Sequence, residues 1–72
     1  MKTVADLKIG EIGIIKNFAD KNMALKLQEM GCLTNAEVRL TYIAPMGDPI
    51  CIQVAGYQLS MRKSEAATMI IK

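Results

Sequence analysis

The chain has 72 residues, a formal charge of +2 and no histidine, and 51% of its residues are apolar although only 4% are aromatic. This length and composition predict one folded domain over residues 1–72 with a small aliphatic core, and the missing histidine excludes Ser/His and Cys/His catalytic pairs. No uncharged run reaches the roughly 20 apolar residues that span a bilayer, and no secretory signal opens the chain, so we expect a cytoplasmic protein without membrane insertion.

The first predicted elements are a helical turn and a strand. Thr3 and Asp6 have the spacing of a capping box, which predicts one turn that ends near Gly10. The run from 11 to 18 is rich in β-branched residues and predicts a strand with a bend or bulge at Gly13. The large apolar side chains of this strand are expected to share one face: Ile12, Ile14 and Phe18.

A helix of two to three turns is predicted next. Both Asp20 and Asn22 suit its N-cap, and Gly31 suits its C-terminal end, because glycine adopts the left-handed conformation easily. Three apolar residues recur at helical spacing and predict a seam that packs on the sheet: Met23, Leu27 and Met30.

The middle of the chain predicts a turn, a strand and a loop. Thr34 and Asn35 form the turn, and the strict alternation from 37 to 42 predicts a half-buried strand. Its inward side chains are expected to be Val38, Leu40 and Tyr42. Two prolines, a glycine and an aspartate between 44 and 49 then require a loop.

The last third predicts a hairpin and a closing strand. Residues 50–54 and 57–61 alternate in polarity on either side of Gly56, with Tyr57 on the inward period. Ser64 is expected to cap a last helical turn before a strand at Ile70 and Ile71. Five short strands, one real helix and two single turns favour a mainly β fold, a small partly open barrel.

Three pieces in this order resemble the FeoA (ferrous-iron transport protein A) family. They are the helix end Leu27–Gly31, the A-P-M-G-D-P loop Ala44–Pro49, and the L-S-M-R-K segment Leu59–Lys63 with Ala66 after it. The resemblance implies an SH3-like five-stranded antiparallel barrel with one packed helix, a fold also appended to iron- and manganese-dependent repressors. It further implies a non-catalytic accessory of ferrous iron uptake that binds cytosolic parts of the GTPase-containing permease FeoB.

The candidate binding residues are those that the barrel core does not explain. The loop presents Ile43, Met46 and Asp48 in a frame that Pro45 and Pro49 stiffen, which lowers the entropy cost of binding. Met46 is open to two interpretations, an exposed recognition residue or a lid folded back on the barrel. The family resemblance, and no spacing, places the helix end beside this loop. The predicted partner-binding set is therefore Leu27, Met30, Ile43, Met46 and Asp48.

Other functions find less support in the sequence. No metal-ligand spacing exists, so we predict no catalytic residue, no metal site and no cofactor, leaving open only a weak contact of Fe²⁺ or another divalent metal. Cys32 and Cys51 are expected to be unpaired buried thiols. Scattered charge and inward-facing Tyr42 and Tyr57 argue against the alternative of a nucleic-acid-binding barrel. A repressor-associated regulatory domain and a homo-oligomer remain alternatives.

Overall fold

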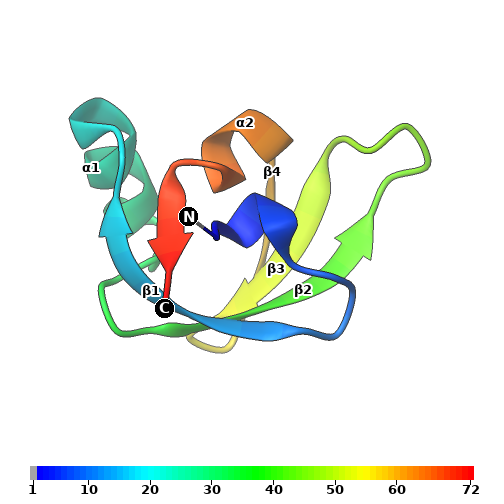
Figure 1. Ribbon diagram of the computed structural model, residues 1–72, viewed down its shortest axis with the longest axis horizontal. Helices are drawn as coiled ribbons and strands as arrows, with labels where there is room; N and C mark the ends of the chain where they lie inside the picture. Colours follow the sequence, from blue (N-terminus) through cyan, green and yellow to red (C-terminus); the bar gives the residue numbers. More distant parts are fainter. Residues whose placement is uncertain (1) are drawn as a thin grey trace.

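Five short strands form one antiparallel sheet in the computed structural model, which describes residues 2–72 (Figure 1). The strand order is β4-β3-β2-β1-β5. The strands are β1 (Ile12–Phe18), β2 (Glu37–Ile43), β3 (Ile50–Val54), β4 (Tyr57–Met61) and β5 (Met69–Ile71). The other elements are the 3₁₀ turn η1 (Val4–Asp6) and the helices α1 (Lys21–Glu29) and α2 (Lys63–Ala66). The predicted five strands and packed helix are confirmed.

The core lies inside the curl of the sheet and is aliphatic. Alternate residues of the central strands point into it, so that β2 has two buried positions and β3 has three. The largest fully buried side chains are Ile15, Leu27, Leu40, Ile52, Met69, Val4, Val38, Val54 and Cys32. Each such aliphatic side chain contributes about 1.5–3 kcal/mol on burial, and no charged or polar residue of 2–72 is buried among them.

Strand β1 differs from its prediction in where it is irregular. Gly13 pairs regularly with Val38, and the register shift falls instead between Ile15 and Asn17, where β1 pairs with β5. Ile12 and Ile14 lie on the exposed face, as the burial alternation shows. Phe18 pairs with Met69, which is fully buried, and packs against the core. The prediction that Ile12, Ile14 and Phe18 share one face is therefore wrong, because a bulge before Phe18 reverses the alternation of the side chains.

A second register shift, between Leu40 and Tyr42, explains why Tyr42 does not point inward. Tyr42 is 50% exposed and pairs with Cys51 on the outer face of β3. Tyr57 pairs with the buried Val54 and so keeps the inward period, but it lies at the end of the hairpin and is 65% exposed. The prediction that both tyrosines face inward is therefore wrong for Tyr42 and holds for Tyr57, which is nevertheless exposed.

The helix ends follow local capping chemistry. Asp20 is the N-cap of α1, because its carboxylate accepts hydrogen bonds from the backbone N–H groups of Asn22 (2.9 Å) and Met23 (3.1 Å). Gly31 follows the helix with φ +104°, as predicted. Ser64 is not a cap: α2 begins at Lys63, and its N-cap is Arg62. The first turn ends at Asp6, before Gly10.

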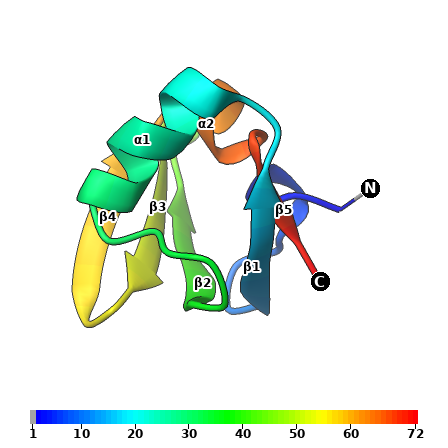
Figure 2. The same ribbon diagram turned by 90° about the vertical axis from the view of Figure 1, so that its left-hand side faces the viewer.

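The elements around the sheet lie at different ends of the molecule. Figure 1 shows α1 at one end of the long axis, the loop between β2 and β3 at the other, and α2 between them. Figure 2 shows α1 lying across the top of the curled sheet. Within residues 2–72, no helix is long and apolar enough to cross a membrane.

Candidate partner-binding surface

The loop from 44 to 49 is held by hydrogen bonds within itself. The Ala44 N–H donates to the Pro49 carbonyl (3.0 Å), and the Gly47 N–H donates to the Ala44 carbonyl (2.8 Å). Gly47 has φ +91°, a conformation that side-chain-bearing residues adopt only with strain. These bonds fix the turn that carries Met46, so its position is set before any partner arrives.

Asp48 anchors the loop to the neighbouring helix. Its carboxylate oxygen Oδ1 accepts a hydrogen bond from the backbone N–H of Lys63, the first residue of α2, at 2.6 Å. A charged acceptor makes this a strong bond, and it satisfies a donor that the helix itself leaves free. Asp48 therefore has a structural role that its prediction as a partner-binding residue did not include.

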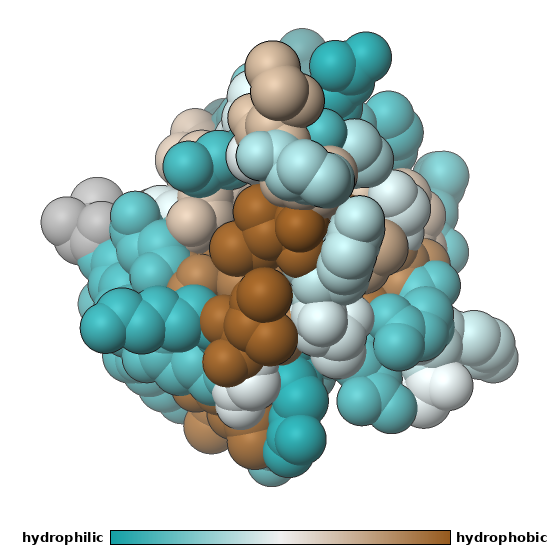
Figure 3. Space-filling model, turned by 90° about the vertical axis from the view of Figure 1, so that its right-hand side faces the viewer, coloured by the Kyte–Doolittle hydropathy of each residue, from teal (hydrophilic) through white to brown (hydrophobic). Residues whose placement is uncertain are grey.

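Met46 points into solvent rather than onto the barrel. Its side chain is 93% exposed, so the interpretation of Met46 as a lid does not hold. Ile43, at the end of β2, is 37% exposed. Both belong to the end of the molecule that Figure 3 faces, where apolar side chains run between polar margins.

A third exposed apolar residue comes from the turn before β1. The Gly10 N–H donates to the Leu40 carbonyl (2.7 Å), which places this turn beside β2. Ile9 in this turn is 62% exposed. We call Ile9, Ile43 and Met46 the loop-end patch. Ile9 was not predicted to bind a partner, because the sequence marks it only as an apolar residue next to a turn glycine.

The structure divides the predicted binding set. Ile43, Met46 and Asp48 lie together at the loop end, whereas Leu27 in α1 and Met30, the C-cap of α1, lie at the opposite end (Figure 1). Strand β1 begins at the end of the sheet that carries the 44–49 loop, because β1 runs antiparallel to β2 and the loop follows the end of β2. Helix α1 follows the other end of β1 and therefore lies away from the loop. Leu27 is 1% exposed and is a core residue. That the exposed members bind a partner stays a prediction.

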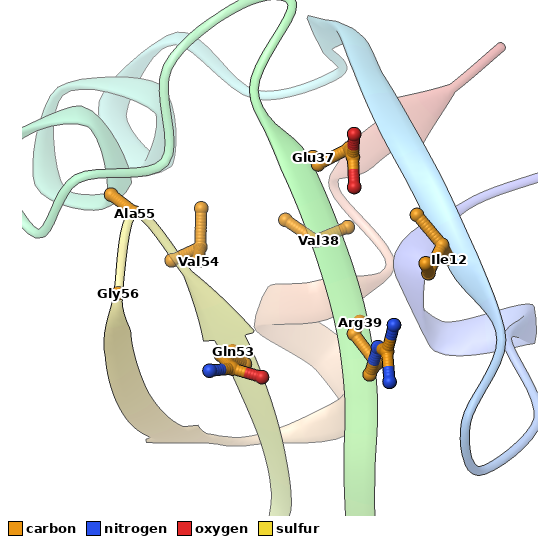
Figure 4. Close-up of a pocket in the computed structure, with 8 residues that line it drawn as sticks. All are labelled: Ile12, Glu37, Val38, Arg39, Gln53, Val54, Ala55 and Gly56. Carbon is orange, nitrogen blue, oxygen red and sulfur yellow. The ribbon is translucent and has the colours of Figure 1, made fainter.

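A shallow groove of about 230 Å³ lies on the outer face of β1, β2 and β3 (Figure 4). Arg39 lies at its centre, opposite Ile12 on one side and Gln53 on the other. Glu37 and the β3–β4 turn complete its walls. One carboxylate, one guanidinium and one amide can make polar contacts, but they do not supply the pair of carboxylates that acid–base catalysis often uses.

The ionisable groups with shifted pKa values serve the fold. Hydrogen bonding from the Arg62 backbone N–H, followed by the Lys26 ammonium (3.0 Å), lowers the pKa of Glu65. Burial raises the pKa of the Cys32 thiol, which keeps it protonated and unreactive. Both cysteines are free, and Cys51 is only partly buried. Within residues 2–72, no three His, Cys, Asp or Glu side chains gather as a metal site would require.

Comparisons with known proteins agree with this architecture. The FeoA-like protein from Clostridium acetobutylicum has 29% identity, covering 100% of this chain and 87% of its own, with a TM-score of 0.89. FeoA from Chlorobium tepidum has 27% identity, covering 97% and 68%, with a TM-score of 0.88. Stenotrophomonas maltophilia FeoA, complexed with zinc, has 25% identity, covering 100% and 91%, with a TM-score of 0.87.

The Stenotrophomonas protein is described as a prokaryotic SH3 domain protein and a candidate activating factor of bacterial ferrous iron transport. A manganese-dependent transcriptional repressor shares the fold, at 12% identity and a TM-score of 0.87, over 35% of its own chain. No curated protein matches this chain. The five antiparallel strands and the short packed helix are those of the SH3-like FeoA structures, as predicted. The FeoA domain model matches residues 2–72, and the chain therefore belongs to the FeoA family, which is linked to ferrous iron transport.

Proposed function

We propose that this protein is a non-catalytic cytoplasmic accessory of ferrous iron uptake, which binds the cytosolic part of a FeoB-type GTPase permease through the loop-end patch. Family membership supports the link to iron transport. The proposed binding surface rests mainly on the exposure of Met46. Its side chain is 93% exposed on a loop that internal hydrogen bonds and Asp48 hold in place. Because the loop is already ordered, binding loses little conformational entropy.

The chemistry of the patch suits a protein partner. Ile9, Ile43 and Met46 offer apolar contact area, and methionine adapts its shape to the surface it meets. The patch is small, so the interface would belong to the smaller, reversible class. Iron is the cargo of the permease in this proposal, and the chain itself needs no bound metal.

The positions of the two tyrosines do not favour the alternative of nucleic-acid binding. Tyr42 and Tyr57 are exposed, but register places Tyr42 on the outer face of the sheet and Tyr57 on the inward period. Bases stack on aromatic side chains that share a surface, so these two do not form a stacking platform. The repressor matches are below 25% identity and bear on the fold alone.

Replacing Met46 by aspartate tests the proposal. Met46→Asp should leave the circular dichroism spectrum and Tm unchanged, since the side chain lies outside the core, while weakening capture by the permease's cytosolic domain at least tenfold and reducing ferrous uptake. Leu25→Asp is the matched control, because Leu25 is 65% exposed on α1 at the opposite end. If Met46→Asp binds and supports uptake as the wild type does, the proposed surface is wrong.

A further inference from the structure

The two edges of the sheet differ in how they are covered. At β5, the Ile71 N–H donates to the Lys2 carbonyl (3.0 Å), and Thr3 forms a bridge with Ile70. The N-terminal segment therefore covers that edge. No comparable segment pairs with β4: among residues 2–72, the backbone hydrogen bonds outside helices and strand ladders include none from Gln58 or Ser60. Figure 2 shows β4 at the margin of the molecule.

The hairpin geometry identifies the groups that β4 leaves free. Ala55 (φ 53°) and Gly56 (φ 82°) form a two-residue turn, in which the flanking residues Val54 and Tyr57 are a hydrogen-bonded pair. Hydrogen-bonded pairs alternate along an antiparallel ladder, and this ladder has no register shift. The N–H and C=O groups of Gln58 and Ser60 therefore point away from β3, toward the open edge.

Strand β4 lacks the features that keep exposed edges from pairing. Such edges are usually protected by charged side chains, proline, bulges or a covering segment. Residues 57–61 contain no charge and no proline. Gln58 and Ser60 are exposed, and Leu59 is partly buried against the core. The edge is thus ready to accept another strand.

We propose that β4 pairs with β4 of a second copy of this chain, antiparallel and centred on Leu59. In this register Gln58 of each copy lies opposite Ser60 of the other, so the outward N–H and C=O groups of both residues find partners. The two Leu59 side chains then meet in a non-hydrogen-bonded pair, where side chains lie closest. The strand is complementary to itself, and it brings no like charges together.

The dimer should be weak and reversible, because strands of five residues bury little surface compared with stable interfaces. It does not depend on the permease: the loop-end patch comes from the end of β2, the loop after it and the turn before β1, all outside β4. An extended segment of another protein could use the same edge chemistry, and the experiment separates the two occupants.

Charge placement at positions 58 and 60 tests the register. Gln58→Lys/Ser60→Lys would set lysine opposite lysine across the proposed seam, whereas Gln58→Lys/Ser60→Glu would set lysine opposite glutamate. Both variants lose the hydrogen bond from Thr41 Oγ1 to Gln58 Oε1 (3.0 Å), so they are matched within the monomer. Sedimentation velocity over a concentration series should show the wild type and the Lys/Glu variant dimerising and the Lys/Lys variant remaining monomeric. A monomeric wild type, or the same behaviour in both variants, would overturn the proposal.

Amide hydrogen exchange of the unaltered protein gives a second test that no substitution can confound. The Gln58 and Ser60 amides should exchange at least tenfold more slowly as concentration rises, while the Leu59 amide, bonded to β3, should not change. Exchange independent of concentration would contradict the proposal. Protection that appears only when the permease's cytosolic domain is added would assign the edge to a strand of that partner instead.

Discussion

Gly13 leaves the space that the side chain of Ile71 fills. A Cβ atom at Gly13 would lie 2.8 Å from Ile71 Cδ1 and 3.3 Å from its Cγ2. We expect Gly13→Val to destabilise the protein by about 1–3 kcal/mol, the range for overpacked cores. In a domain of this size, about 1 kcal/mol lowers Tm by roughly 4–8 °C, which thermal unfolding followed by circular dichroism resolves.

The cause of that loss can be isolated with Ile71→Val, which removes Cδ1. Alone, this change should cost about 0.5–1.5 kcal/mol. Combined with Gly13→Val it should cost clearly less than the sum of the two, since the clash is relieved. Strict additivity would show that Gly13 is required for a reason other than the contact with Ile71.

Positions along the strands show what periodicity can and cannot predict. The alternation correctly assigned Val38 and Leu40 to the core, because period 2 holds while the ladder is regular. It failed at Tyr42 and Phe18, each of which follows a register shift. A bulge depends on how two strands pair, and neither strand's own sequence records it.

The bond from Asp48 links the β2–β3 loop to α2. Asp48→Ala should lower the unfolding free energy by about 1 kcal/mol, because the Lys63 N–H loses a charged acceptor. Asp48→Asn keeps an oxygen acceptor and should cost less. Hydrogen exchange at the Lys63 amide should accelerate in the alanine variant, and an unchanged rate would contradict the anchoring role.

Glu65 joins α1 to α2 through Lys26 and should make this contact pH-dependent. Hydrogen bonds from the Arg62 N–H and Lys26 lower the Glu65 pKa from 4.5, so its contribution is present above pH 4.5 and is lost as pH falls through the lower folded value. Glu65→Gln should therefore be less stable than the wild type at neutral pH, with the difference disappearing in acid. Urea unfolding of both proteins from pH 7 to pH 3 measures this difference in unfolding free energy. A difference that stays constant over the whole pH range would exclude the ionisation of Glu65 as its cause.

The limits of single elements were predicted more reliably than the contacts between elements. The C-terminal limit of α1 followed from Gly31, and the N-cap was narrowed to Asp20 or Asn22, of which the structure shows Asp20, because these residues act within their own turn. The placement of the helix end beside the 44–49 loop was wrong, because it depends on which end of the sheet each connection occupies. Asp48 likewise finds its partner 15 residues away, at Lys63, a contact that no local pattern reveals.

The whole domain should fold without a metal ion. Its core is a continuous cluster of aliphatic and sulfur-containing side chains, and apolar burial is the main source of stability for such a fold. A chelator should therefore leave Tm unchanged within error. A clear drop in Tm, restored by adding Fe²⁺ or Zn²⁺, would contradict this expectation.

NMR mapping can locate the partner surface, which we propose is the loop end of the barrel. Titrating the ¹⁵N-labelled protein with the permease's cytosolic domain should shift or broaden the amide signals of Ile9, Ile43 and Met46, and leave those of α1 unchanged. Signals that change on α1 or around Arg39 in the outer groove, with the loop unaffected, would show that the partner binds elsewhere and that the proposed loop-end surface is wrong.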